Sequence, residues 1–169
     1  MILHKNNIIL FNLSSFIPHI IMIIVIIYGL ATTEQDTTLS RQQKSQHYLR
    51  LYVSWVITSV GFAYGFGHIF MSDKVAKSIG WGTGSEFQRE IGFANLSFAI
   101  MAMYIDNASL NIDAYKACVV GYISFLGGCL LVHIQEIIKH GNYSFNNIVA
   151  APLFSIMNII YGSYLVANS

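Results

Sequence analysis

Charged residues are scarce in this chain. Asp, Glu, Lys and Arg together make up 10% of its 169 residues, whereas soluble globular domains carry about 25%. This scarcity argues against a soluble enzyme and against a disordered tail. Nine Lys and Arg against eight Asp and Glu leave a net charge of +1, so no basic field exists to hold a phosphate backbone. We therefore expect no nucleic-acid partner.

Cysteine is equally scarce, and the motifs of several enzyme classes are missing. Cys118 and Cys129 fall on one expected helix, roughly 16 Å apart at the helical rise, which is too far for a disulfide between them. The sequence has no Gly-x-Ser-x-Gly, Cys-x-x-Cys or Walker pattern, which are the local signatures of serine hydrolases, thiol redox enzymes and nucleotide-binding loops. We expect no cofactor.

Long stretches without Asp, Glu, Lys or Arg are what the chain does have. They cover residues 6–33, 51–72, 91–105, 117–135 and 140–169. A membrane-spanning helix needs about 20 mostly apolar residues, and these runs lack the alternation of a strand. We predict an all-α, multi-pass transmembrane helix bundle, a single integral membrane domain over residues 1–169. Its five spans are expected at about 8–30, 49–71, 88–105, 115–138 and 148–167.

The first stretch also has the Lys and apolar run of a secretory signal peptide. Its apolar part is longer than the roughly 7–15 residues of such peptides, and residues 29–32 make a poor cleavage site. We expect it to be retained. The polar segment 31–46 is predicted to be an exposed loop, and residues 72–79 a short helix at the membrane surface, capped by Ser72.

Tyrosine and basic residues bear on the topology. Five spans place eight of the ten tyrosines near the membrane side opposite the N-terminus, and Tyr favours membrane interfaces. Lys and Arg divide almost evenly between the two sides, so the positive-inside rule hardly favours either orientation. We expect a location in the cell membrane, the inner membrane if the source is bacterial.

Polar and ionisable residues gather on the side of the N-terminus. Such residues are costly within membrane spans and therefore mark functional candidates. His133, Glu136 and His140 share one helix face by their spacing. The residues converging on this side are His68, Glu86, Glu90, His133, Glu136 and His140, with Asn142, Asn146 and Asn147 just beyond.

Three interpretations of this cluster remain open. The first is structural, with polar groups fixing how the helices pair. The second is a pocket that binds or conducts a small polar solute or a proton, covered by Trp81. The third is a metal or redox site formed by His68, Glu90, His133 and His140. Close helix packing is expected at Gly61, Gly65, Gly127 and Gly128, because small residues let helices approach.

One segment resembles a known family. The residues that carry the likeness are Gly67-His68, Ile79-Gly80-Trp81, Ser85, Phe87-Gln88, Glu90, Gly92-Phe93-Ala94-Asn95, His133 and His140-Gly141-Asn142-Tyr143. They resemble an uncharacterised family of small prokaryotic integral membrane proteins, known only as a domain of unknown function. Glu86 departs from the family's usual proline.

The resemblance implies a polytopic membrane protein and no established activity. It groups His68, Gln88, Glu90, Asn95, His133 and Asn142 into one site. A more distant similarity to DoxX-like membrane proteins suggests a redox-partner role by analogy. The expected partners are the lipid bilayer and a small polar solute or proton, and a homo-oligomer stays open. The favoured function is binding or conducting the solute, with a metal or redox enzyme and a structural subunit as alternatives.

Overall fold

The computed structural model describes residues 17–169, and all regular structure within them is helical. The helices are α2 (Ile17–Thr33), α3 (Arg41–Leu51), η1 (Tyr52–Ile57), α4 (Thr58–Phe70), α5 (Ser72–Ser78), α6 (Phe87–Asn107), α7 (Ile112–His140), η2 (Asn146–Ala150) and α8 (Ala151–Asn168). The segments η1 and η2 are π-helical turns, which widen a helix locally. The predicted all-α class is confirmed.

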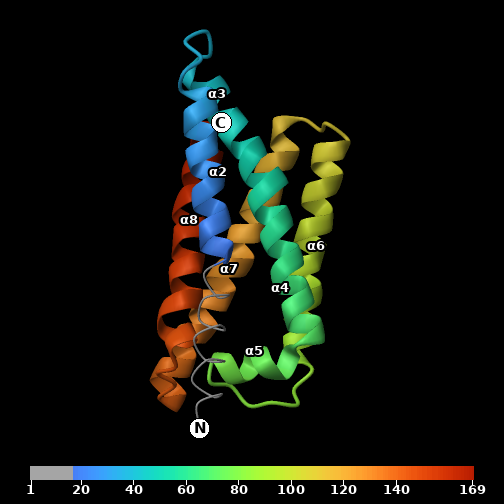
Figure 1. The fold of residues 1–169 in the computed structure, drawn as a ribbon, viewed down its shortest axis with the longest axis vertical. Helices are drawn as coiled ribbons and strands as arrows, with labels where there is room; N and C mark the ends of the chain where they lie inside the picture. The colour runs from blue at the N-terminus through green and yellow to red at the C-terminus, as the bar shows by residue number, and fades with distance from the viewer. Residues whose placement is uncertain (1–16) are drawn as a thin grey trace, which may run out of the picture.

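Most of these helices run along the long axis of the molecule (Figure 1). They are α2, the continuous helix α3–η1–α4, α6, α7 and the continuous helix η2–α8, and successive members run in opposite directions. The short helix α5 lies across one end of the bundle. The predicted surface helix at 72–79 thus exists within one residue of its expected bounds.

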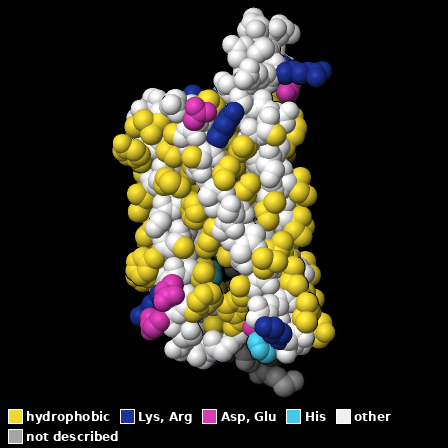
Figure 2. Space-filling view, turned by 180° about the vertical axis from the view of Figure 1, so that it is seen from behind, with side chains coloured by type: hydrophobic (Ala, Val, Ile, Leu, Met, Phe, Trp, Pro, Cys, Tyr) yellow, Lys and Arg dark blue, Asp and Glu magenta, His cyan; other side chains and the backbone are white. Residues whose placement is uncertain are grey.

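Three of the described helices are long and apolar enough to cross a membrane: Arg41–Phe70, Ile112–His140 and Asn146–Asn168. The shorter apolar helix α2 has 17 residues, and residues 8–16 of the expected first span lie outside the described residues. Helix α6 has 21 residues but carries Arg89, Glu90 and Asp106, so its uncharged part falls short of about 20 residues. Charged side chains gather toward the two ends of the molecule, with a broad uncharged band between them (Figure 2).

Two connector predictions were wrong in detail. The expected loop over 31–46 ends early, because α3 already begins at Arg41. Ser40 caps that helix: its hydroxyl accepts from the Gln43 backbone N–H, and the Gln43 side chain accepts from the Ser40 N–H. Ser72 does not cap α5 but lies within it, and Met71 occupies the cap position without a side-chain hydrogen bond.

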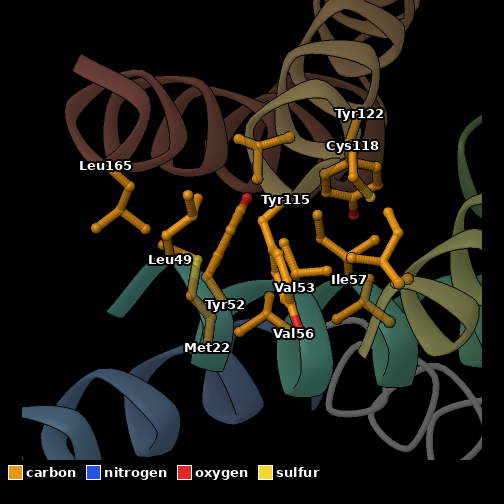
Figure 3. Packing of buried hydrophobic residues seen from close by; sticks show 14 of the residues in the cluster. Met22, Leu49, Tyr52, Val53, Val56, Ile57, Tyr115, Cys118, Tyr122 and Leu165 are labelled. Atoms are coloured by element: carbon orange, nitrogen blue, oxygen red, sulfur yellow. The ribbon is translucent and has the colours of Figure 1, made fainter. Parts of the chain in front are cut away.

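The hydrophobic core lies where α3, η1, α7 and α8 meet, and Figure 3 shows its side chains packed between these helices. Tyr52, Tyr115 and Tyr122 are each 0–1% exposed, so these three belong to the core and not to an interfacial belt. The Tyr52 hydroxyl donates to Asn158 Oδ1 at 2.6 Å, which satisfies two buried polar groups. Tyr28 is 57% exposed, which agrees better with the expected position of tyrosines at a membrane interface.

Helices α4 and α6 pack closely along most of their length. A Cβ added at Gly61 would lie 2.8 Å from the Asn95 carbonyl oxygen, and one at Gly92 would lie 2.6 Å from Ile69 Cγ1. At Gly65 the nearest atom would be the Gly92 carbonyl oxygen at 3.2 Å. Glycine is therefore needed for this approach. Gly127, by contrast, has no described atom within 4 Å of an added Cβ, and the same is true of Gly128.

The α4–α6 contact predicts a difference between two substitutions on α4. Gly61→Ala should lower the free energy of unfolding by about 1–3 kcal/mol, because the new methyl group meets backbone atoms that cannot move aside. Gly67→Ala is the matched control, since its Cβ would meet nothing within 4 Å. Denaturation in detergent measures both. Equal effects would show that α4 and α6 do not approach as described.

Candidate functional site

Two helix pairs diverge toward the α5 end of the bundle. Helix α4 packs on α6, and α7 packs on α8. The helix α3–η1–α4 meets α7 through α3 and η1, whereas nearer α5 the two pairs move apart and α5 crosses the gap (Figure 1). A cavity of about 750 Å³ fills this gap, and Figure 2 shows a dark hollow in the same half of the molecule.

The cavity is lined mainly by apolar side chains, and none of the described residues lining it is Asp, Glu, Lys or Arg. Its polar lining residues come from every neighbouring element except α2. They are Tyr64, His68, Ser78, Trp81, Gln88, Asn95, Ser124, His133, Asn146 and Ser155. Concave, mostly apolar sites with a few convergent polar groups are the usual form of small-molecule pockets.

His68 and Gln88 form one polar pair in the wall. His68 Nδ1 lies 2.7 Å from Gln88 Oε1 across the α4–α6 contact. An amide oxygen can only accept a hydrogen bond, so Nδ1 carries the proton and donates. In the neutral ring this leaves Nε2 as an acceptor.

His133 is held in the same way from the opposite wall. Its Nδ1 donates to Oδ1 of Asn147, at 2.7 Å. Asn147 is fully buried, and its amide nitrogen donates to the Asn142 carbonyl oxygen at 3.0 Å. Asn147 is the second residue of the π-helical turn η2, which begins at Asn146. The widened turn thus contains the residue that orients the His133 ring.

Asn142 ties the segment after α5 to the end of α7. Its amide nitrogen donates to the Ile79 carbonyl oxygen at 2.7 Å, and its Oδ1 accepts from the Ser144 N–H at 3.1 Å. Gly80 has φ +75°, and a Cβ there would collide with Asn142 Oδ1. Glycine is required at this position both by backbone conformation and by the close approach of Asn142.

Trp81 follows this turn and lines the cavity. Its ring centroid lies 5.6 Å from that of His133 and 5.9 Å from that of Phe87. Its backbone N–H donates to the Ala76 carbonyl oxygen at 2.8 Å, which fixes the residue against α5. The indole Nε1 is buried and has no hydrogen-bond partner among the described residues. An indole N–H can only donate, so it presents an unused donor.

The structure brings together only part of the predicted site. His68, Gln88, Asn95, His133 and Trp81 all line the cavity. Asn142 lies outside the lining and bonds the loop that carries Trp81.

The predicted carboxylates lie elsewhere. Glu90 is exposed on α6, and Glu136 forms an ion pair of 2.9 Å with the exposed His140. Within residues 17–169 no group of three or more His, Cys, Asp or Glu side chains could hold a metal ion. The alternative set of His68, Glu90, His133 and His140 is therefore not assembled.

Several lining residues were missed by sequence reasoning. Tyr64 stands four residues before His68 on α4, and their rings lie 6.2 Å apart. This spacing is a helical signal that could have found it. Phe154 and Ser155 come from α8, and their place in the wall depends on how α8 packs against the other helices.

A second, smaller hollow of about 450 Å³ lies at the opposite end, where its lining includes Glu34, Arg41 and Lys44. Glu34 accepts from the Tyr48 hydroxyl at 2.8 Å and from Lys44 Nζ at 3.1 Å. These two hydrogen bonds, that of Tyr48 first, lower the pKa of the Glu34 carboxyl. Glu34, Lys44 and Tyr48 thus serve as one another's hydrogen-bond partners. Their bonds connect the loop after α2 to α3.

The turn at Gly80 supports a prediction about the cavity's closed end. Gly80→Ala should break the Asn142–Ile79 hydrogen bond and release the segment from α5 to Trp81. Hydrogen exchange of residues 72–84 should then rise, while that of α7 stays unchanged. Gly82→Ala is the control, because an added Cβ there meets nothing within 4 Å. Unchanged exchange in Gly80→Ala would contradict this role for the turn.

Comparison with known proteins places the chain in a family without assigning it an activity. A family model described as a family of unknown function (DUF6790) matches residues 15–169. No curated protein and no solved structure matches the chain. The match covers nearly the whole sequence and confirms the expectation of an uncharacterised family. The chain therefore belongs to this family of unknown function.

Proposed function

We propose that the chain is a single five-span domain of the cell membrane that binds a small uncharged molecule with hydrogen-bonding groups. Apolar helices of spanning length support a bilayer environment. The alternating directions of α2, α3–η1–α4, α6, α7 and η2–α8 support five crossings. Helix α6 crosses the membrane although its uncharged stretch is the shortest of the five. Its close packing on α4 shelters Gln88 and Asn95 from lipid.

One observation carries the binding role. The cavity brings His68, Gln88 and His133 together from three helices without any charged side chain in its described lining. Burying an unpaired charge is far more costly than burying a hydrogen-bonded polar group. A neutral solute therefore suits these walls better than a metal ion or an organic ion.

Roles follow from position. The Nδ1–H of His68 donates to Gln88, and that of His133 donates to Asn147. Each neutral ring therefore presents its Nε2 as a hydrogen-bond acceptor. Trp81 covers the end of the cavity, and Asn142 positions the loop that carries it. Conduction of a proton is the second candidate, favoured by two histidines in facing walls of one cavity, because an imidazole can both take up and release a proton.

The five-span topology is testable by cysteine labelling, with Cys118 and Cys129 first replaced by serine. Single cysteines at Thr83 and Tyr143 should react with an impermeant reagent from one membrane side. Those at Thr38 and Ser109 should react from the other side. Thr83 and Ser109 flank α6, so reaction of both from the same side would show that α6 does not cross.

Access of a neutral solute to the cavity is testable through Trp81. The chain has two tryptophans, so Trp55→Phe leaves Trp81 as the only fluorescent tryptophan. Acrylamide, a small neutral amide, should quench it in nanodiscs, and iodide should quench it much less because the walls offer no positive charge. If acrylamide fails to reach Trp81, the cavity does not admit polar solutes and the structural interpretation of the cluster is favoured.

A further inference from the structure

Two residues in the cavity wall each carry a buried hydrogen-bonding atom that no described residue satisfies. One is the Trp81 indole N–H, a donor, and the other is the Asn146 side-chain oxygen, an acceptor. Both residues line the cavity, and Asn146 is only 6% exposed. Buried polar groups in folded proteins nearly always have a partner, so each exception needs an explanation.

These atoms belong to residues at the α5 end of a mainly apolar space. Trp81 follows α5, and Asn146 begins η2, just after the end of α7. From His133 to Ser124 the cavity follows α7 away from this end for about 14 Å at the helical rise. The side chains along that path include Phe125, Leu126 and Phe154. The cavity therefore has most of its polar lining toward one end and mainly apolar side chains along its length.

The cavity also opens toward the side of the bundle. Ala63 on α4 and Gly128 and Val132 on α7 line it while being exposed. All three lie within helices long and apolar enough to cross a membrane. Figure 2 shows the hollow below the middle of the molecule, between the charged groups at its two ends. An opening at this level faces lipid rather than water.

We propose that the occupant of the cavity is a neutral amphiphile taken from the bilayer. Its head group, a hydroxyl or a similar group that both donates and accepts, accepts from Trp81 Nε1 and donates to Asn146 Oδ1. Its hydrocarbon body lies between α4 and α7. The volume of about 750 Å³ is within the range of sites that enclose a whole small ligand, roughly 300–1,000 Å³.

This proposal rests on the cavity being a binding site for an uncharged molecule, as proposed above, and it adds the class and orientation of that molecule. An ionic head would have no counter-charge in the described walls, so a phosphate or an ammonium is excluded on energetic grounds. A pure hydrocarbon would leave the Trp81 and Asn146 groups unsatisfied, which is unfavourable for buried polar groups. Only a molecule with both parts satisfies the whole cavity.

The test uses long-chain alcohols carrying one bromine, a contact quencher of tryptophan, with the full chain in nanodiscs. In Trp55→Phe protein, an alcohol brominated beside the hydroxyl should quench Trp81 saturably. The same alcohol brominated at its far end should quench Trp81 less. The matching trimethylammonium and the matching bromoalkane should quench it only weakly. Trp81→Phe protein retains Trp55, which is 60% exposed on η1, and reports how much of each compound has entered the lipid.

A substitution tests the head-group contact. Asn146→Leu in the Trp55→Phe background should weaken alcohol binding about three- to tenfold, the usual contribution of one hydrogen bond. Binding of the bromoalkane should not become weaker. Ser97→Ala is the control, because Ser97 lies outside the cavity lining and its hydroxyl bonds the Phe93 carbonyl oxygen at 2.8 Å. It should leave binding unchanged.

The outcomes separate this proposal from the proposed function. Equal quenching by the alcohol, the ammonium and the alkane would overturn the neutral amphiphile, and so would stronger quenching from the far-end bromine. Acrylamide quenching of Trp81 would persist in either case if the cavity still binds uncharged solutes. Loss of acrylamide quenching would instead overturn the proposed function itself.

Discussion

The close contact between α4 and α6 determines where the rest of the bundle can be open. Three glycines, Gly61, Gly65 and Gly92, let these helices approach until backbone meets backbone. In a bilayer, such van der Waals contact replaces the hydrophobic drive that pairs helices in water. Helices α7 and α8 form a second pair. With the two pairs joined at the α3 and η1 level, the space between them nearer α5 is left for a cavity.

A second set of contacts closes the end of that cavity. The helix α5 is too short to be stable alone, so its position depends on bonds made by its neighbours. Asn142 supplies one to Ile79, and Asn147 continues the chain of hydrogen bonds from Asn142 to His133. The orientation of a cavity histidine and the position of the closing loop are thereby coupled. A change at either end of this network is felt at the other.

The sequence was informative where a local physical rule applies. The lack of charge marked the apolar helices, and the apolar face of the run 72–79 predicted a short helix there, although its expected cap at Ser72 was wrong. The same reasoning failed for residues 41–46, because their polarity outweighed the capping box of Ser40 and Gln43. It also placed Tyr52 and Tyr115 in an interfacial belt, where burial in the core depends on which helices pack together.

In the candidate site, too, some positions could be predicted from the sequence and others depend on how the helices pack. His68 and His133 were expected together because a five-span topology would bring them to one side, and Gln88 was added by the family resemblance. All three residues line one cavity. Glu90 satisfies the same topological argument and yet is exposed. Topology assigns a residue to a membrane side, whereas the rotation of its helix decides whether it faces the cavity. On α6 that rotation is set by the contact of Gly92 with α4, which depends on how the two helices pack and not on the residues around Glu90 alone.

The rotation of α6 has a chemical consequence for the cavity. Turning Gln88 inward and Glu90 outward leaves an amide rather than a carboxylate beside His68, and Asn147 of η2 supplies an amide to His133. Amide oxygens accept the Nδ1 protons without adding charge, so both rings can stay neutral in an apolar space. A carboxylate beside His68 would favour a charged ring and attract ions or water. The neutrality of the cavity at His68 is thus set by how α4 and α6 pack, and it restricts which molecules the cavity can hold.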